Sequence, residues 1–468
     1  MDDRIRLNYT NVLNNRVEQH GVKLAEIKKL SKKFKEIHRK IEEDTRSGKL
    51  GFRKLPYNTK LVPEILSLAE RYRYKYNNFV VIGIGGSALG NIAIQQALHH
   101  SCWNMLSKEE RKGWLRLFVL DNVDPVFIKD ILDIIDVRET VFNIISKAGT
   151  TAECLANFFV LLKELKKCYK KEDLDKFKQH IIITTGPEKG FLRELVNKEG
   201  YTSFVIEDNV VGRFSVLSPV GLVSAAFTGV DIKMLLRGAR EIDTLCSKND
   251  SLFNNIAGMY AVLQYLLYQK GKHISVMLPY SNNLYYLADW FRQLWAESLG
   301  KKYNLNNQIV NVGPTPIKAL GVTDQHSQLQ LYIEGPYDKV VTFLSLEKYS
   351  VKVDIPLFYD HYLGGKTLNQ LIKAEEEATR LALTKNLRPN LTISIPEISP
   401  YYLGQLFQFF ELAAAYAGEL FEINPFDQPG VVLGKELTYA LMARPGYEKQ
   451  KNIIEREIEK MKFSKYIV

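Results

Sequence analysis

The chain has 468 residues, enough for two or three domains around a large apolar core. Hydrophobic residues make up 46% and charged residues 25%, ordinary values for a globular protein that exclude a largely disordered chain. The net charge of +10 is compatible with nucleic acid, but the lysines of residues 163–178 alternate with acidic residues in a helical pattern. We therefore expect solvated helix faces and no nucleic-acid partner.

No apolar stretch reaches the roughly 20 residues that span a bilayer, and the Met1-Asp-Asp-Arg start lacks the apolar core of a signal peptide. We expect a cytoplasmic protein that does not bind membranes. The four cysteines show no CxxC pairing, which predicts free thiols. The pattern His99-His100-x-Cys102 is only a weak candidate for a metal site.

The first 76 residues are predicted to be helical and charged, lying on the outside of the main body. Apolar residues recur there at the spacing of one helix face. They are Val22, Leu24, Ile27, Leu30, Phe34, Ile37 and Ile41.

A buried strand is predicted at Phe79–Ile82, because the run is apolar without polar alternation. Gly83, Gly85 and Gly86 follow, and a helix is expected from Ala88 onward. Glycines let a ligand approach the backbone closely, and a helix N-terminus favours an anion.

This turn has two interpretations. Gly83-x-Gly85-x-x-Ala88 fits a loose dinucleotide fingerprint, but the next acidic strand end, Asp121, lies well past the ~20 residues expected for a ribose-binding carboxylate. Gly86-Ser87 instead favours a phosphate or sugar oxygen. The alternative for Ser87 is that it only caps the helix.

The rest of the chain alternates apolar strands with helices, which predicts an α/β fold with parallel sheets. Further strands are expected at Leu117–Leu120, Val141–Ile145, Ile181–Thr184 and Ser203–Ile206, and then at Ile274–Leu278, Val340–Leu346 and Leu391–Ile395. We divide the chain into a helical segment (1–76), two α/β domains (77–250 and 251–400) and a C-terminal helical region (401–468). Two similar halves indicate a duplicated architecture, although no repeat of residues is visible.

The turn Ser146-Lys-Ala-Gly-Thr-Thr151 follows a predicted strand and precedes an apolar helix. Thr150 and Glu153 have the spacing of a capping box. A capped helix leaves Ser146 and Lys147 unexplained, whereas a lysine, three hydroxyls and free backbone N–H groups together predict a phosphate cradle.

Four further positions carry chemistry. Arg213 precedes the predicted helix start Ser218-Pro219, where it could form a surface ion pair or hold an anionic intermediate. Glu297 follows Asp289 and Gln293 on one helix face, near the helix C-terminus, which suits a general base. His326 alone would more often be a structural histidine than a catalytic one. Lys435 is expected in the first turn of a helix, where its positive charge opposes the helix dipole.

Together these motifs resemble the glucose-6-phosphate isomerase family over roughly residues 50–445. They occur in the family's order and spacing: Ser146–Thr151, Gly212-Arg213-Phe214-Ser215, Glu297-Ser298-x-Gly300-Lys301, Gln325-His326 and Phe426-Asp-Gln-x-Gly-x-x-x-Gly-Lys435. The resemblance implies two sugar-isomerase (SIS-type) αβα-sandwich domains with mainly parallel sheets, and a helical C-terminal arm carrying a catalytic lysine. It also implies a homodimer that interconverts glucose 6-phosphate and fructose 6-phosphate, in glycolysis and gluconeogenesis, without metal or cofactor.

The resemblance implies a role for each matched residue. Glu297 would be the base, His326 and Lys435 would open the sugar ring, and Arg213 would stabilise the intermediate. His326 would come from the neighbouring subunit. Substrate and phosphate contacts are implied for Gly86, Ser87, Ser146, Lys147, Ala148, Gly149, Thr150, Thr151, Gln293 and Gln428.

Three positions depart from the family pattern. Ala148 stands where many members have serine or threonine, Val211 replaces a glycine before Gly212-Arg213, and Val432 stands where glutamate is common. None removes a proposed catalytic group. Two other functions stay open: an isomerase for a mannose or amino-sugar phosphate, and a non-catalytic sugar-phosphate sensor that binds protein or DNA. A sensor would need the cradle but not the acid, histidine and lysine together.

Overall fold

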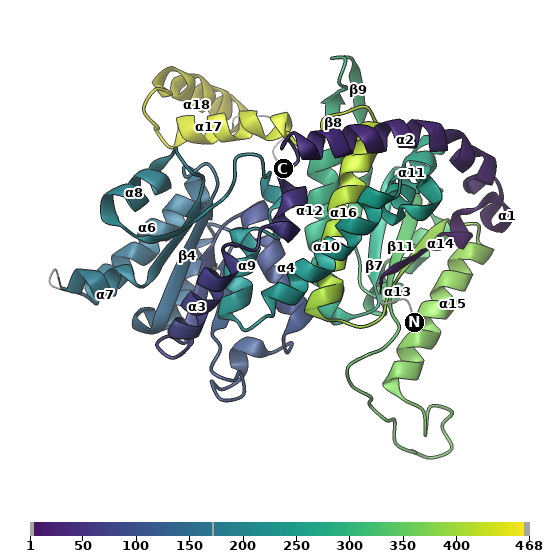
Figure 1. Cartoon of the computed structure of the whole chain (residues 1–468), viewed down its shortest axis with the longest axis horizontal. Coiled ribbons are helices and arrows are strands. Elements are labelled where there is room, and N and C mark those ends of the chain that lie inside the picture. The colour runs from purple at the N-terminus through teal and green to yellow at the C-terminus, as the bar shows by residue number, and fades with distance from the viewer. Residues whose placement is uncertain (1–3, 171–172, 463–468) are drawn as a thin grey trace.

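The computed structural model describes residues 4–170 and 173–462. Two five-stranded sheets lie side by side along the long axis of the molecule, each covered by helices, and a helical arm projects at the C-terminal end (Figure 1). The expected α/β fold with two mainly parallel sheets is confirmed.

The first sheet has the order β3-β2-β4-β5-β6, and all its strands are parallel. Their bounds are β2 (Asn78–Ile82), β3 (Arg116–Leu120), β4 (Thr140–Ser146), β5 (Ile181–Thr185) and β6 (Thr202–Val205), close to the predicted ranges. Phe79 and Val81 belong to one hydrophobic cluster, and Val80 and Ile82 to another. Both faces are therefore buried, which explains why the strand residues lack polar alternation.

The second sheet has the order β1-β12-β11-β7-β10, with only β1 antiparallel. Three strands were predicted: β7 (Ile274–Pro279), β11 (Lys339–Leu346) and β12 (Asn390–Ile395). The two edge strands, β1 (Arg6–Asn8) and β10 (Thr315–Lys318), were not. β10 contains Pro316, which an edge strand tolerates but which obscures the pattern in the sequence. A separate hairpin pairs β8 (Lys301–Tyr303) with β9 (Ile309–Val312).

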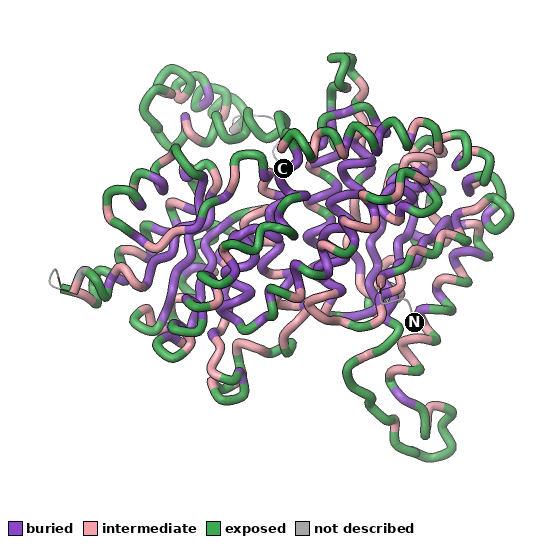
Figure 2. The backbone as a smooth tube through the Cα atoms, viewed as in Figure 1, coloured by how far each residue is buried: buried purple, intermediate pink, exposed green. Residues whose placement is uncertain are grey.

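The long helix α16 (Pro400–Leu420) runs through the centre of the second half (Figure 1). It packs against α10 (Ile232–Lys248), α11 (Ile256–Gln269) and α12 (Tyr285–Leu299). The Ser399 side chain caps the helix N-terminus, and Pro400 occupies its first position. Nearly all the remaining residues of the helix are buried (Figure 2). An all-round apolar helix needs such complete cover.

The other helices cover the sheets. α2 buries Ile27, Phe34, Ile37 and Ile41, as its periodicity predicts, while Leu24 is exposed. The remaining bounds are α1 (Asn14–Val17), α2 (Leu24–Arg46), α3 (Val62–Arg73), α4 (Leu89–Leu98), α5 (Pro125–Ile134), α6 (Ala152–Lys167), α7 (Leu174–Lys178), α8 (Phe191–Glu199), α9 (Pro219–Phe227), α13 (Thr323–Ser327), α14 (Leu329–Glu334), α15 (Leu368–Lys385), α17 (Val432–Leu441) and α18 (Glu448–Lys462). Within the described ranges, none of the helices is long and apolar enough to cross a membrane.

Glu411 is a carboxyl group inside α16. It is fully buried, and neither side-chain oxygen has a hydrogen-bond partner within residues 4–170 and 173–462. Burial raises the pKa of Glu411 well above its ordinary value, so the folded protein holds the acid protonated. The unfolded chain ionises it from about pH 4.5 upward.

We expect Glu411→Leu to stabilise the protein increasingly as pH rises. The wild type loses about 1.4 kcal/mol of unfolding free energy per pH unit above the unfolded pKa, until the folded group ionises, and leucine removes that loss. Denaturant unfolding at pH 5 and pH 8 measures the difference. Glu411→Gln is the matched control and should also lose the slope. Parallel pH profiles for wild type and both variants would contradict the expectation.

Candidate active site

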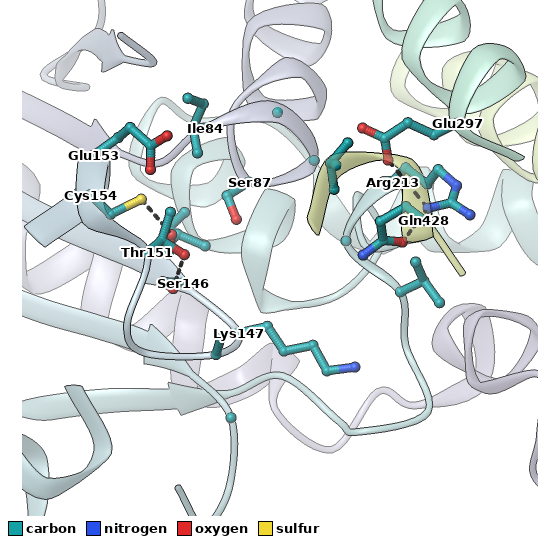
Figure 3. A pocket seen from close by; sticks show the side chains of 18 of the residues that line it. Ile84, Ser87, Ser146, Lys147, Thr151, Glu153, Cys154, Arg213, Glu297 and Gln428 are labelled. Carbon is teal, nitrogen blue, oxygen red and sulfur yellow. Dashed lines mark hydrogen bonds and ion pairs between the residues drawn. The ribbon is translucent and has the colours of Figure 1, made fainter. Parts of the chain in front are cut away.

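A cavity of about 770 Å³ opens at the carboxyl ends of β2 and β4. The loops after β2, β4 and β5 form one side, while α12 and residues near 426–435 form the other. Figure 3 shows Ser146 and Thr151 across the cavity from Glu297 and Arg213, with Ser87 between them. Carboxyl ends of parallel strands are the usual place for a ligand in such sheets.

The glycine turn after β2 brings two loops into close contact. A Cβ on Gly86 would lie 2.3 Å from the carbonyl carbon of Gly212, so only glycine fits there. The turn Gly85–Ser87 is followed by α4, whose N-cap is Ala88 and receives no side-chain hydrogen bond. The alternative that Ser87 caps the helix is therefore wrong, and Ser87 lines the cavity.

The predicted phosphate cradle lies between β4 and α6. The Ser146 and Thr151 hydroxyls are 2.7 Å apart, and the Gly149 N–H donates to the Ser146 oxygen at 3.1 Å. The capping box expected from Thr150 and Glu153 is wrong, because Thr151 is the extended residue before the helix and Glu153 is only its second residue. No side chain caps α6, so its first-turn N–H groups have no side-chain partner in the described residues.

Lys147 connects this turn to the next loop. Its ammonium donates to the carbonyls of Asp208 at 2.6 Å and Val210 at 3.0 Å, and burial lowers the pKa of Lys147. Lys147 and Ala148 line the cavity, whereas Gly149 and Thr150 are not among its lining residues. The lysine thus fixes the turn while keeping its side chain at the cavity wall.

Arg213 is the most connected side chain of the site, only 2% exposed. Its guanidinium donates to Ser298 at 2.8 Å, to Glu297 at 3.2 Å and to the Gln428 side-chain oxygen at 2.9 Å. It also donates to the carbonyls of Pro425 and Asp427. Burial lowers the pKa of Arg213, and Glu297 opposes that shift. This buried cation therefore joins the first half to α12 and to the C-terminal segment.

Glu297 lies in the last turn of α12, with its side chain 35% exposed. One carboxylate oxygen accepts from Arg213 at 3.2 Å and the other from the Gln293 amide at 3.1 Å. Asp289, predicted on the same helix face, is instead buried and pairs with Arg292 and Lys318 outside the cavity. Of the three polar residues, only Gln293 and Glu297 line the cavity.

Lys301 is a second buried cation below Glu297. Its ammonium donates to the Glu297 carbonyl at 2.6 Å and to the Asp427 carbonyl at 2.8 Å. Burial, together with the nearby Arg213 charge, lowers the pKa of Lys301. Arg213 and Lys301 thus hold the segment Pro425–Gln428 from two sides.

Lys435 reaches the cavity from α17, where it is the fourth residue. Gln428 lines the same wall. The helix itself packs mainly against α18 and is otherwise exposed. The segment Pro425–Gln428 therefore attaches the arm that carries this lysine to the body of the protein.

His326 lies elsewhere. It is an exposed residue of the short helix α13 and does not line the cavity of its own chain. The resemblance to the family assigns His326 to the site of a neighbouring subunit, and that assignment stays a prediction.

The sequence analysis missed the loop after β5. Pro187, Glu188 and Lys189, flanked by Gly186 and Gly190, line the cavity, as does Asp208. The signal was present, since Gly186 and Pro187 come one residue after the predicted strand Ile181–Thr184, and Gly190 follows. In residues 4–170 and 173–462, no group of three or more His, Cys, Asp or Glu side chains is placed to hold a metal ion, and the His99-His100-x-Cys102 pattern forms none.

Comparison with known proteins gives a consistent result. The family model described as phosphoglucose isomerase matches residues 72–456. The chain is 45% identical to a glucose-6-phosphate isomerase of Carboxydothermus hydrogenoformans, over 96% of each sequence. It is 42% identical to one of Rubrobacter xylanophilus, over 85% of this chain and 90% of that protein.

Two crystal structures are similar to the whole arrangement. A hypothetical protein from Thermus thermophilus matches with a TM-score of 0.82 at 37% identity, over 94% of this chain and 100% of that one. A glucose-6-phosphate isomerase from Chlamydia trachomatis matches with a TM-score of 0.69 at 26% identity, over 84% and 76%. Sequence similarity over nearly the whole length, on this architecture, makes the chain a member of the phosphoglucose isomerase family.

Proposed function

We propose that this protein interconverts D-glucose 6-phosphate and D-fructose 6-phosphate, as an aldose-ketose isomerase of glycolysis and gluconeogenesis in the cytoplasm. The observation that carries the proposal is the pairing of a carboxylate with a buried guanidinium, Glu297 and Arg213 at 3.2 Å, opposite a hydroxyl-rich turn at a helix N-terminus. The chemistry needs a base, a fixed cation and a remote phosphate anchor, and this cavity supplies all three.

The phosphate anchor would be Ser146–Thr151. The uncapped first turn of α6 offers N–H groups and a positive dipole end to the phosphate oxygens. Ser87 and the Ser146 and Thr151 hydroxyls add donors. Binding energy from the phosphate, which takes no part in the reaction, would place C1 and C2 of the sugar near Glu297.

Glu297 would carry the proton between C2 and C1. Removing a proton next to a carbonyl gives a cis-enediol intermediate with negative charge on oxygen. Arg213 lies beside the base and is held by five hydrogen bonds, so it needs no rearrangement to stabilise that charge. Gln293 orients the second oxygen of the base.

Ring opening would use Lys435 and His326, which would move protons between the ring oxygen and the C1 or C2 hydroxyl. Lys435 lines the cavity within one chain, and His326 would come from the partner of a homodimer. Two exposed apolar stretches support such a partner: residues 351–362, and residues 432–442, which comprise helix α17 and the residue after it. Their exposed apolar residues are Val351, Val353, Leu357, Phe358, Tyr359, Tyr362, Val432, Leu433, Leu437, Leu441 and Met442.

If His326 acts in trans, mixing two inactive variants should restore activity. In a heterodimer of one Glu297→Gln chain and one His326→Ala chain, one site carries both substitutions and the other site carries neither. Random pairing makes about half of the dimers heterodimers, so about a quarter of all sites should be intact. Activity after unfolding and refolding the two variants together measures this. Each variant refolded alone is the control. An inactive mixture that contains heterodimers would contradict the trans assignment.

A coupled assay tests the substrate. Fructose 6-phosphate should be consumed far faster than mannose 6-phosphate or glucosamine 6-phosphate, and a reversed order would favour the rival isomerases. A sensor would bind the sugar phosphate without exchanging the C1 or C2 proton with solvent. Solvent deuterium entering the recovered sugar therefore separates an enzyme from a sensor.

A further inference from the structure

A second cavity of about 860 Å³ lies at the carboxyl edge of the other sheet. Ser281 and Asn283 after β7, Lys348 and Ser350 after β11, and Glu397 after β12 line it. No residue of this cavity belongs to the one that contains Glu297.

The two sheets have the same strand order. β3-β2-β4-β5 in the first corresponds to β10-β7-β11-β12 in the second, and all eight strands are parallel to their neighbours within these sets. In the first sheet, β2 is followed in the sequence by β3 on one side of it and then by β4 on its other side. In the second sheet, β7 is followed in the same way by β10 and then by β11. The crevice at that reversal, β2/β4 or β7/β11, is where open α/β sheets bind ligands. The second cavity occupies the second crevice.

The two halves also contact each other through corresponding helices. Each central strand is followed by a short turn and a helix: Gly85–Ser87 and α4 in the first half, Asn282–Leu284 and α12 in the second. α12 packs against α4 and brings Gln293 to the Gly85 turn. In return, Asn283 donates to the carbonyls of Gln96 at 3.1 Å and Ala97 at 3.3 Å, near the end of α4.

The contact between α4 and α12 places two histidines at the second cavity. Glu297 follows Gln293 by four residues at the end of α12, and His99 and His100 follow Gln96 by three and four at the end of α4. Both histidines line the second cavity. The His99 Nε2 atom is buried without a hydrogen-bond partner in the described residues, and burial lowers the pKa of His99 to about 4, so the ring is neutral.

The charges of the two cavities are also alike. Four cations and four carboxylates line the first: Lys147, Lys189, Arg213, Lys435, Glu153, Glu188, Asp208 and Glu297. Three of each line the second: Arg111, Lys112, Lys348, Glu110, Asp231 and Glu397. Glu110 and Asp231 accept backbone N–H bonds and are thereby occupied, while the Lys348 side chain has no hydrogen bond or ion pair within the described part of the chain.

The second cavity is not a copy of the cradle. Its counterpart of α6 is α15, where the Thr367 side chain accepts from the Gln370 N–H and the Gln370 side chain accepts from the Thr367 N–H, as in a capping box. The Leu368 N–H donates to the Val353 carbonyl. An anion there would have to be bound by side chains, chiefly Lys348.

We propose that this second cavity is a separate binding site for a small, hydroxylated phosphate ester. Lys348 binds the phosphate, Ser281 and Ser350 contact hydroxyls, and the neutral His99 ring supplies a further polar contact. Among the described residues that line it, the cavity has no counterpart of the Glu297–Arg213 ion pair, so the site binds its ligand and does not isomerise it.

Equilibrium binding of sorbitol 6-phosphate, which cannot isomerise, tests this with the full chain. We expect two sites per chain in the wild type, one in Lys348→Ala, and two again in Lys348→Arg. Lys176→Ala is the matched control because Lys176 is an exposed lysine outside both cavities that pairs with Asp173. kcat/KM should stay within about twofold in all three variants, since none alters the first cavity.

A wild type without any site that Lys348→Ala removes or weakens would overturn the proposal, whether the total is one site or two. A single wild-type site that is lost in Lys348→Ala would support it and count against binding in the first cavity. Unphosphorylated sorbitol should not occupy the second site at the same concentration, and equal binding of both would remove the phosphate contact. Loss of isomerase activity with the second site intact would count against the proposed function alone.

Discussion

Replacing Glu297 by glutamine is expected to lower kcat by about 10³-fold or more while leaving KM nearly unchanged. The amide keeps the size of the carboxylate, and its oxygen can still accept from Arg213, whereas its nitrogen cannot accept from the Gln293 amide. The shape of the cavity is unchanged, so the sugar should still bind. The amide cannot accept the C2 proton, and the described residues place no other carboxylate beside Arg213 within the cavity.

Steady-state kinetics on fructose 6-phosphate, with proton exchange at C1 and C2 followed by NMR, measures the effect. Glu153→Gln is the matched control, because Glu153 lines the cradle side of the same cavity and pairs with neither Arg213 nor Gln293. The control should retain most of its activity. Near-normal turnover in Glu297→Gln would exclude Glu297 as the base.

Replacing Arg213 by lysine should impair both catalysis and folding. Lysine keeps the charge, but one ammonium cannot reach all five oxygens that the guanidinium bonds, among them the Pro425 and Asp427 carbonyls. We expect kcat to fall about 10²-fold, the usual cost of a lost charge-stabilising donor. Leaving buried acceptors unpaired should also lower the unfolding free energy by about 2–3 kcal/mol.

Kinetics and denaturant unfolding together test this prediction. Arg292→Lys is the control: Arg292 lies on the same helix as Glu297 but is half exposed and pairs with Asp289 away from the cavity. Its effects should be small in both measurements. A stable Arg213→Lys protein with full activity would show that the guanidinium fork is dispensable.

The sequence predicted the central strands because both faces of each sheet are buried, which leaves uninterrupted runs such as Val141–Ile145. It did not predict β1 and β10, which are only three and four residues long at the sheet edges. Their existence depends on a neighbouring strand rather than on their own pattern. The same holds for the start of α6, where one residue of extended backbone decides which threonine precedes the helix.

The sequence predicts those parts of the candidate site whose residues lie close together along the chain. Ser146 and Thr151 lie within one turn, so their proximity follows from spacing. The contacts of Arg213 with Ser298 and Gln428 join positions 85 and 215 residues apart. Nothing in the local sequence encodes such contacts. The resemblance to a family identified the candidate site residues. The fold shows the hydrogen-bond partners of each residue.

The first cavity takes its phosphate-facing turn and Arg213 from one half of the polypeptide, and Gln293 and Glu297 from a helix of the other. A protein fragment that stops before residue 251 would thus retain the phosphate-facing turn and Arg213, but it would lack the base, Lys435 and all five acceptors that hold Arg213. Catalysis in this enzyme is therefore not modular: gene fission or domain shuffling between the sheets would separate the phosphate-facing turn from the base and from the groups that hold Arg213 in place.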